Sequence, residues 1–505
     1  MGKPSRRPGR EERKLVLKEK KKARKELKKR QAKEGLKKLV KPTLPNAKSP
    51  YKTVEQEQEE RQKVVEAHLK VLRTRLPRLL ARLARIEDPR NPGTIKHKTT
   101  VLFLYGLLMF VLQYSSRREA NREMSMPMLL ENLRLLFPEL ETLPHHDTLG
   151  RFLSRIDVGK IEAALVAEIR SLITNKKLRN YLVERSCLIA IDGTWKLSRD
   201  YCWSEECLER RAGEDYLYYV YVLEANLVLG NGITLPLLSE FLEYSTDATG
   251  ETKQDCELKA FRRLVARLKK FFPRLPVALL LDGLYANGPA MAMCRRHNWD
   301  YMIVLKDDSL PSVWDEVHGL RQLQTGQTLG QIWGARRQHF YWVNEIEYEY
   351  KQDGRPKTTD VHIAVCEENW EDIDPKTGKI VTKTARHAWL SSKPLTHKNI
   401  ARRCNQMGRF RWKIENNILK EKHQGYQYEH CFSYNWNAMK GYHYLMRLGH
   451  LFNTLAHNSI YLAAMVRERG IRGMIKFLRE TLAAPWLDAG RIRDLLTRKH
   501  QLRLE

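Results

Sequence analysis

The chain has 505 residues and a net charge of +30, with 90 Lys and Arg residues against 60 Asp and Glu residues. This length allows about two to four domains with substantial cores, and 42% hydrophobic residues is ordinary for a globular protein. The charge calls for a polyanionic partner, and nucleic acid fits it better than a membrane surface. A basic tail that only keeps the protein soluble is the alternative.

The eight cysteines are scattered without a Cys-x-x-Cys pair, which is typical of reduced thiols rather than of a disulfide framework. The longest apolar run, residues 101–112, includes Tyr105 and Gly106 and is too short to span a bilayer. The first fifty residues are charged throughout and do not resemble a signal peptide. We therefore expect a soluble, cytoplasmic protein.

Four segments surround a predicted core. Residues 1–50 hold 20 Lys and Arg residues against 5 Asp and Glu residues, which predicts a basic flexible arm with a possible helix from Glu11 to Lys38. Helical spacing of apolar residues predicts a helical DNA-binding region over 51–183, including a buried helix over 97–113 and a further helix with Asp147 as its cap. Alternating residues and hairpin turns predict a β-rich insertion over 309–394, and helical patterns predict C-terminal helices over 461–505.

The core covers residues 184–308 and 395–460. Its pattern is three successive strands, a helix, a strand, a helix and a further strand. The expected strands are 186–198, 216–229, 233–244, 277–282 and 301–306. This order is that of a ribonuclease H-like core, so we expect an α+β or α/β fold with a mixed sheet flanked by helices.

Three acidic residues stand in distinctive local contexts. Asp192 and Asp282 follow short apolar runs, where a buried strand would bring a carboxylate to the rim of a sheet. Glu415 lies inside a predicted helix that Thr396 caps and Gly425 ends. Three carboxylates brought together in this way are suited to holding two divalent cations against a phosphodiester.

Two basic residues accompany Glu415 on its helix. At 100° per residue, Arg411, Glu415 and Lys422 fall within about 40° of one another and share a face. A glutamate on such a face is able to bind a metal while the flanking cations hold phosphates nearby. The alternative is a solvated face with an Arg–Glu pair four residues apart.

These residues carry a family resemblance. The chain resembles bacterial insertion-sequence transposases of the DDE type, in the group marked by a Tyr-x2-Arg-x3-Glu-x6-Lys motif. The match comprises Arg411-x3-Glu415-x6-Lys422, Ile191-Asp192-Gly-Thr and Leu281-Asp282-Gly-Leu-Tyr285, and the resemblance covers roughly residues 90–460. The tyrosine position of the motif is Gly408 in this chain, and residues 1–50 lie outside the resemblance.

The resemblance implies an activity and a set of ligands. Asp192, Asp282 and Glu415 would be the catalytic acids and would bind two Mg2+ ions, for which Mn2+ would substitute. Arg411 and Lys422 would contact DNA phosphates near the scissile bond. The protein would bind the terminal inverted repeats of its element as a homodimer on paired double-stranded DNA ends, near the bacterial nucleoid. It would then cleave the DNA and transfer the strand to a target.

Other residues carry weaker hypotheses. Trp342, in the insertion, is a candidate for stacking on a flipped base, with packing inside the insertion as the alternative. Asn287 is a candidate for holding a metal-bound water, with a helix N-cap as the alternative. Two other functions also remain: a domesticated, non-catalytic DNA-binding protein, and a ribonuclease H-like nuclease without strand transfer.

Overall fold

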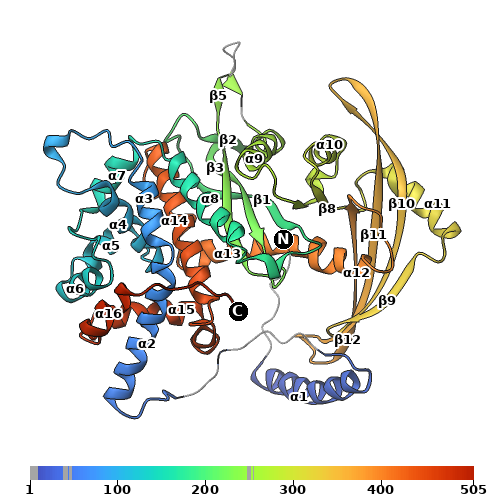
Figure 1. Cartoon of the computed structure of the whole chain (residues 1–505). Coiled ribbons are helices and arrows are strands. Elements are labelled where there is room, and N and C mark those ends of the chain that lie inside the picture. Colours follow the sequence, from blue (N-terminus) through green and yellow to red (C-terminus); the bar gives the residue numbers. More distant parts are fainter. Residues whose placement is uncertain (1–8, 38–43, 45–47, 247–251, 254) are drawn as a thin grey trace. The chain divides into compact units, whose positions relative to one another are not determined.

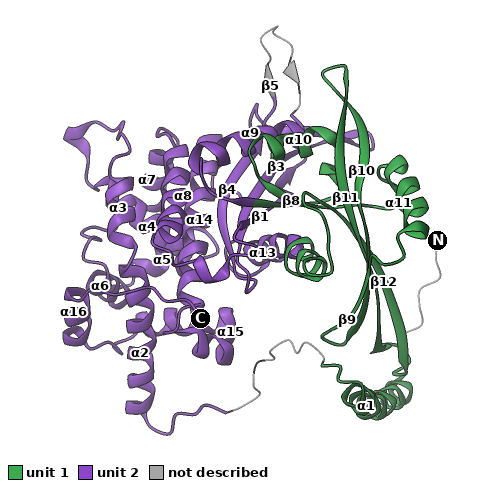
Figure 2. Ribbon diagram, turned by 45° about the vertical axis from the view of Figure 1, so that its right-hand side comes forward, with its two compact units in different colours: residues 1–42, 278–409 green, residues 43–277, 410–505 purple. Residues whose placement is uncertain are grey.

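The computed structural model describes residues 9–37, 44, 48–246, 252–253 and 255–505. Its elements form two compact units, which Figure 2 colours separately (Figures 1 and 2). Unit 1 consists of residues 1–42 and 278–409, and unit 2 of residues 43–277 and 410–505. In the described part of the chain, no helix is both long and apolar enough to cross a membrane.

The N-terminal half of unit 2 is helical. Every residue from Val101 to Val111 is buried in one of its helices, which confirms the buried helix expected over 97–113. His145, rather than Asp147, caps the helix that begins at His146, because its ring nitrogen accepts the Asp147 N–H at 3.3 Å. The helices are α2 (Val54–Arg73), α3 (Leu76–Leu83), α4 (Thr99–Val111), α5 (Arg117–Met124), α6 (Pro127–Leu136), α7 (His146–Leu153) and α8 (Gly159–Thr174), with 3-10 turns at Pro92–Thr94 and Arg179–Tyr181.

The sheet of unit 2 is antiparallel and centred on one long strand. Strand β3 (Asp215–Val228) pairs with β1 (Cys187–Arg199) on one side and with β4 (Thr234–Leu242) and β2 (Leu208–Ala212) on the other. The three strands expected from the sequence are confirmed as β1, β3 and β4, while β2 was not predicted. A two-stranded hairpin of β5 (Ser245–Thr246) and β6 (Thr252–Lys253) follows.

Helices flank this sheet. α9 (Glu257–Phe271) packs on β4 through a buried apolar stripe, and α14 (Trp436–His457), which is buried over almost its whole length, contacts β4, α4 and α8. α13 (Trp412–His423) packs on β1 and β3. The chain ends with α15 (Ala463–Leu482) and α16 (Ala489–Thr497), which pack on α2 and α6.

Unit 1 combines parallel and antiparallel strands. β7 (Val277–Leu281) and β8 (Asp300–Val304) run parallel, with α10 (Gly288–Arg296) between them in sequence. β12 (Ile380–Ser391), the last strand of the predicted insertion, pairs antiparallel with β8. The other strands of the insertion follow it across the sheet in the order β11 (Arg355–Ile373), β10 (Arg336–Gln352) and β9 (Thr328–Trp333). The unit also holds the 3-10 turn η3 (Gly283–Tyr285), α11 (Pro311–Leu323) and α1 (Arg10–Lys33).

The helix expected from Thr396 to His423 is not one regular helix. It begins as α12 (Ile400–Arg402), widens into a π-helix at η4 (Arg403–Met407) and tightens into a 3-10 helix at η5 (Gly408–Arg411) before α13. Thr396 makes no side-chain cap, whereas Gly425 follows α13 with a positive φ of 102° and ends it as expected. Within unit 1 the π segment buries Arg403 completely, with its guanidinium bonded to Ser391 Oγ at 3.0 Å.

These observations define the fold class. The chain is mixed α/β, with a mostly helical N-terminal part and a mixed sheet flanked by helices. That arrangement is compatible with the expected ribonuclease H-like core.

Candidate active site

Asp192 lies where β1 leaves the hydrophobic core. The five residues before it are buried, whereas Asp192 and Gly193 are half-buried. The strand continues to Arg199, so Asp192 sits within β1 rather than at the rim expected from the sequence. A Cβ on Gly193 would lie 2.2 Å from the Tyr221 hydroxyl, so only glycine leaves room for the Tyr221 ring next to the acid.

Arg411 connects Asp192 with Glu415. Its guanidinium lies 3.5 Å from an Asp192 carboxylate oxygen and 2.5 Å from a Glu415 carboxylate oxygen. The Arg411 side chain is only 9% exposed, against 19% for Asp192 and 45% for Glu415. The two acids of unit 2 therefore face a common cation. The pairing of Arg411 with Glu415, four residues apart, was the alternative considered from the sequence, and it is present together with the Arg411–Asp192 contact.

Lys422, the other cation predicted on this helix, has a different partner. Its ammonium group lies 2.9 Å from Glu429 and 5.9 Å from the centre of the Tyr428 ring. The side chain is 14% exposed. The structure therefore places Lys422 toward the C-terminal end of α13 in an ion pair with Glu429.

Asp282 belongs to unit 1 and directly follows β7, as the sequence predicts. Its carboxylate accepts the Leu284 N–H at 3.0 Å and so caps the short turn η3. Asn287 caps α10 by accepting the Ala290 N–H at 3.0 Å, which agrees with the N-cap alternative for this residue. A Cβ on Gly283 would lie 3.0 Å from the Lys306 side chain, which places a cation beside the Asp282 loop.

Trp342 lies in the packed interior of the insertion. It is 4% exposed and meets the His397 ring edge to face at 4.8 Å. A side chain this deeply buried has no face free for a DNA base, so the geometry matches the packing alternative. Trp333, at the end of β9, is half-buried and carries the Arg409 guanidinium 4.9 Å from its ring centre.

Gly408, which takes the tyrosine position of the motif named above, contacts a buried indole. A Cβ added to Gly408 would lie 2.7 Å from Trp389 Nε1, and Trp389 is 1% exposed. A tyrosine would have to displace this indole, so Trp389 explains why glycine stands here.

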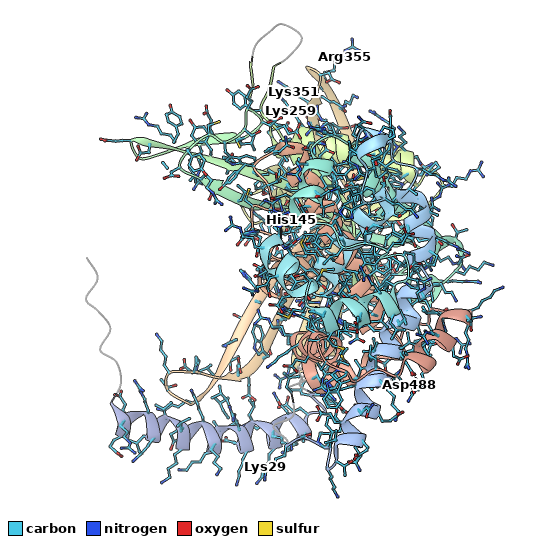
Figure 3. The ribbon with its side chains drawn as sticks, turned by 90° about the vertical axis from the view of Figure 1, so that its left-hand side faces the viewer. Lys29, His145, Lys259, Lys351, Arg355 and Asp488 are labelled. Atoms are coloured by element: carbon cyan, nitrogen blue, oxygen red, sulfur yellow. The ribbon has the colours of Figure 1, made fainter. Side chains whose placement is uncertain are left out.

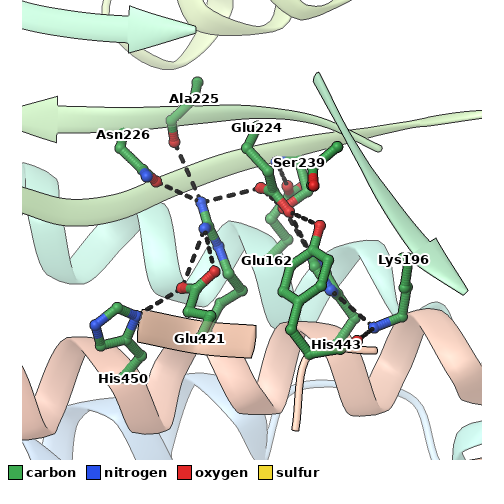
Figure 4. A network of polar contacts seen from close by, with 12 residues as sticks. Glu162, Lys196, Glu224, Ala225, Asn226, Ser239, Glu421, His443 and His450 are labelled. Atoms are coloured by element: carbon green, nitrogen blue, oxygen red, sulfur yellow. Dashed lines mark hydrogen bonds and ion pairs between the residues drawn. The ribbon is translucent and has the colours of Figure 1, made fainter. Parts of the chain in front are cut away.

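A buried ionic network lies beside the candidate site, on the same face of the sheet. Glu224 of β3 stands directly opposite Asp192 in the sheet register, and directly opposed residues share a face. The Arg447 guanidinium of α14 lies 3.1 Å from Glu224 and 3.2 Å from Glu421 of α13, and all three side chains are fully buried (Figure 4). Burial disfavours both carboxylates, but Arg447 and the neighbouring histidines outweigh it, lowering the pKa of Glu421 and bringing that of Glu224 to about 2.

Lys196 completes the charge balance of this network. Its ammonium group donates to the Tyr428 carbonyl at 2.9 Å and contacts His443 Nδ1 at 3.5 Å (Figure 4). Burial lowers the pKa of Lys196 to about 8 and that of His443 to about 4, so at neutral pH the lysine is charged and the histidine is neutral. Two carboxylates therefore face two cations, and His443 donates from Nε2 toward Ser239 at 2.9 Å.

The network links three elements that carry or flank the site. Glu224 belongs to β3, Glu421 to α13 and Arg447 to α14. Removing any one of them would leave an uncompensated buried charge. The position of α13, and with it of Glu415, therefore depends on side chains that sequence analysis did not single out.

Comparison with known families gives one finding. The family model described as DDE_Tnp_1-associated matches residues 80–167, which span the segment from α3 into α8. Comparison with curated proteins finds no match. The family match points to a DDE-type transposase family, which implies DNA as a partner and divalent metal use in general.

Proposed function

We propose that this protein is a DDE transposase that binds the terminal inverted repeats of its element and moves the element by cut-and-paste transposition. The observation that carries the proposal is the approach of Asp192 and Glu415 to the same guanidinium, on the strand and helix where the motif requires them. The transposase-associated match over residues 80–167 supports it independently, because that segment lies outside the three acids.

The donor set fits divalent metal ions. Asp192, Asp282 and Glu415 offer carboxylate oxygens, the ligands that Mg2+ prefers. Arg411 already places positive charge next to two of these carboxylates, so the site accommodates a cation between them. Bound Mg2+ or Mn2+ would activate the attacking oxygen and stabilise the leaving oxygen of a phosphodiester.

The protein's own groups would position the DNA. Arg411 would turn one part of its guanidinium from the carboxylates to a phosphate near the scissile bond, while Lys422 would contact a phosphate further along α13. The helical part of unit 2 would recognise the element end. We infer a homodimer on paired ends from the resemblance, as a part of this proposal.

The decisive experiment is cleavage of linear DNA that carries the sequences flanking the gene. Full-length protein is incubated with end-labelled DNA and Mg2+, and nicked, hairpin and joined products are separated on a denaturing gel. We expect D192N, D282N and E415Q each to abolish cleavage, a loss of at least about 100-fold, and to leave end binding within about twofold. D494N, which changes an exposed carboxylate on α16, is the matched control and should cleave normally.

The products separate the proposal from its alternatives. Joined products identify strand transfer, whereas nicks without joining identify a nuclease. Binding without any nick in the wild-type protein identifies a non-catalytic DNA-binding protein. An acid whose replacement leaves cleavage intact has no place in the metal site.

A further inference from the structure

The basic N-terminal segment is a helix fixed to the insertion. Within the predicted arm, the possible helix from Glu11 to Lys38 is present as α1, residues 10–33 (Figure 1). Its Ala23 and Leu27 are buried. Leu36, just after the helix, is 7% exposed. Three apolar side chains therefore anchor one face of an otherwise charged segment.

Two of the three hairpin turns of the insertion hold this helix. The Lys37 N–H donates to the Gly334 carbonyl at 3.0 Å, and Arg337 pairs with Glu34, so the β9–β10 turn fixes its C-terminal end. The β11–β12 turn fixes the other end: a Cβ on Gly378 would lie 2.8 Å from the Val16 carbonyl oxygen. Such close approach of two backbones requires a defined position of α1 on the hairpins.

Strand β11 adds a contact in the last turn of the helix. Arg30 of α1 lies 3.0 Å from Glu371. The contacts toward both ends, together with buried Ala23 and Leu27 between them, orient α1 about its own axis. The same residues of α1 therefore always face away from the insertion.

The outward face of α1 is a stripe of lysines. Five of them recur every three or four residues and fall within about 80° of one another, centred opposite Ala23 and Leu27. At 1.5 Å per residue the stripe is about 22 Å long. We call this set the lysine stripe: Lys14, Lys18, Lys21, Lys25 and Lys29, all exposed, with Lys29 labelled in Figure 3.

Little on the protein neutralises this stripe. Lys14 pairs with Glu11 at 2.8 Å, an exposed pair of small energetic value. Within the described residues, the other four lysines of the stripe have no ion pair or side-chain hydrogen bond. The helix as a whole holds thirteen Lys and Arg residues against four Glu residues, a net charge of +9.

We propose that the lysine stripe binds the phosphate backbone of duplex DNA without reading its sequence. Lysine ammonium groups are compact point charges that suit phosphates, and contacts to phosphates carry no sequence information directly. Its length matches about six base pairs of duplex at 3.4 Å per pair. The partner rests on the function proposed above, and the contact gives the insertion a DNA-binding role of its own.

The test is the salt dependence of binding to a 40-base-pair duplex of random sequence. The stripe variant K18Q/K21Q/K25Q/K29Q leaves the anchoring residues of α1 intact. Its control, K259Q/K270Q/K476Q/K499Q, removes the same charge from exposed lysines of unit 2 that lie outside helices α2 to α8. Equal helix content of the two variants by circular dichroism establishes that α1 persists.

We expect the stripe variant to bind the duplex at least about tenfold more weakly at 0.1 M salt. Its slope of log K against log salt should fall by about 3.6, which is 0.9 for each lost phosphate contact. The same slope should fall by less than about 1 for the control variant. Equal slopes for the two variants would overturn the proposal. Binding to a single-stranded RNA is measured in parallel, and a loss of affinity for this RNA without a loss of affinity for the duplex would also overturn it.

Failure of this inference is distinguishable from failure of the proposed function. At saturating protein the stripe variant should cleave element-end DNA at the wild-type rate, because the stripe lies outside the proposed metal site. Normal duplex binding by the stripe variant, together with inactive acid variants, would refute the stripe alone. Reduced duplex binding with fully active acid variants would refute the transposase site alone.

Discussion

Arg447 supplies the positive charge that two buried carboxylates require, so its removal tests the network behind the candidate site. R447M keeps much of the side-chain volume and deletes the charge. Glu224 and Glu421 would remain fully buried but would lose their contacts with the Arg447 guanidinium, whose nitrogen atoms lie 3.1 Å and 3.2 Å from the two carboxylates. Breaking a buried pair in this way costs about 3–5 kcal/mol, a large part of the roughly 5–15 kcal/mol by which a domain is stable.

The assay is urea unfolding of the full-length protein, followed by tryptophan fluorescence and circular dichroism. R498M is the matched control, because Arg498 pairs with Asp494 on the surface, where the two side chains are 67% and 57% exposed. Such an exposed pair on one helix contributes about 0.3–0.5 kcal/mol. The double variant R447M/E421Q removes one of the two stranded charges and should recover part of the loss.

The pH dependence gives a second and independent readout. Without Arg447, burial raises the pKa of the remaining carboxylates above their unfolded values, so the folded state binds protons more readily than the unfolded chain. Stability arising from a raised pKa is present at low pH and is lost as pH rises. The amount by which R447M lowers the free energy of unfolding should therefore become smaller as the pH falls from 7.5 to 5. A deficit below about 1 kcal/mol that does not vary with pH would refute the charge-balance argument.

Two further predictions concern other buried groups. Burial lowers the pKa of His68 to about 4 from 6.5, so its contribution to stability is present above pH 6.5 and is lost as pH falls toward 4. H68L should reduce the difference in unfolding free energy between pH 7.5 and pH 5.0 by about 2 kcal/mol, and an unchanged difference would contradict this. G408A should lower the unfolding free energy by about 1–3 kcal/mol, because its Cβ would press on the buried Trp389. G473A, a helical control with its nearest neighbour at 3.5 Å, should instead gain up to about 1 kcal/mol, and equal effects would contradict the packing argument.

The order of strands was predictable because each carries a local pattern. The alternating or continuous apolar runs of β1, β3, β4, β7 and β8 appear in the sequence at almost their observed bounds. Short β2 was missed, since Leu208–Ala212 is mostly exposed and has no apolar pattern. Local periodicity thus identifies strands that bury a face and overlooks those at an edge.

The pairing of Arg411 with Glu415 was also predictable, because helical phase alone brings residues four apart together. Its approach to Asp192 depends on how α13 packs on β1, which spacing along the chain does not define. Glu224 and Arg447 left a signal that was not used: each is a charged residue inside an apolar segment, and such charges are almost always paired when buried. Sequence shows that a partner is needed but does not say which residue it is.

The irregular helix before α13 and the docking of α1 depend on contacts between distant segments. The π turn at Arg403–Met407 accompanies a buried Arg403 bonded to Ser391, twelve residues away, and Gly408 is explained only by Trp389. A lysine-rich segment by itself suggests a solvated arm, because its three anchoring apolar residues are few among many charges. The glycines at Gly334 and Gly378 complete the docking, and nothing in the arm's own sequence indicates them.

The separation of buried from solvent-facing charge bears on how the proposed site would work. Glu224 and Glu421 are balanced by Arg447 and Lys196 inside the protein, so the position of α13 on the sheet does not rely on Arg411. Asp192 and Glu415 are balanced near the surface by Arg411, where the 45% exposure of Glu415 lets water replace a lost contact. Exchange of this guanidinium for other cations would therefore leave the charge balance of Glu224 and Glu421 unchanged. A buried network that holds the scaffold, together with a separate cation between two more exposed acids, suits the metal-dependent site proposed above.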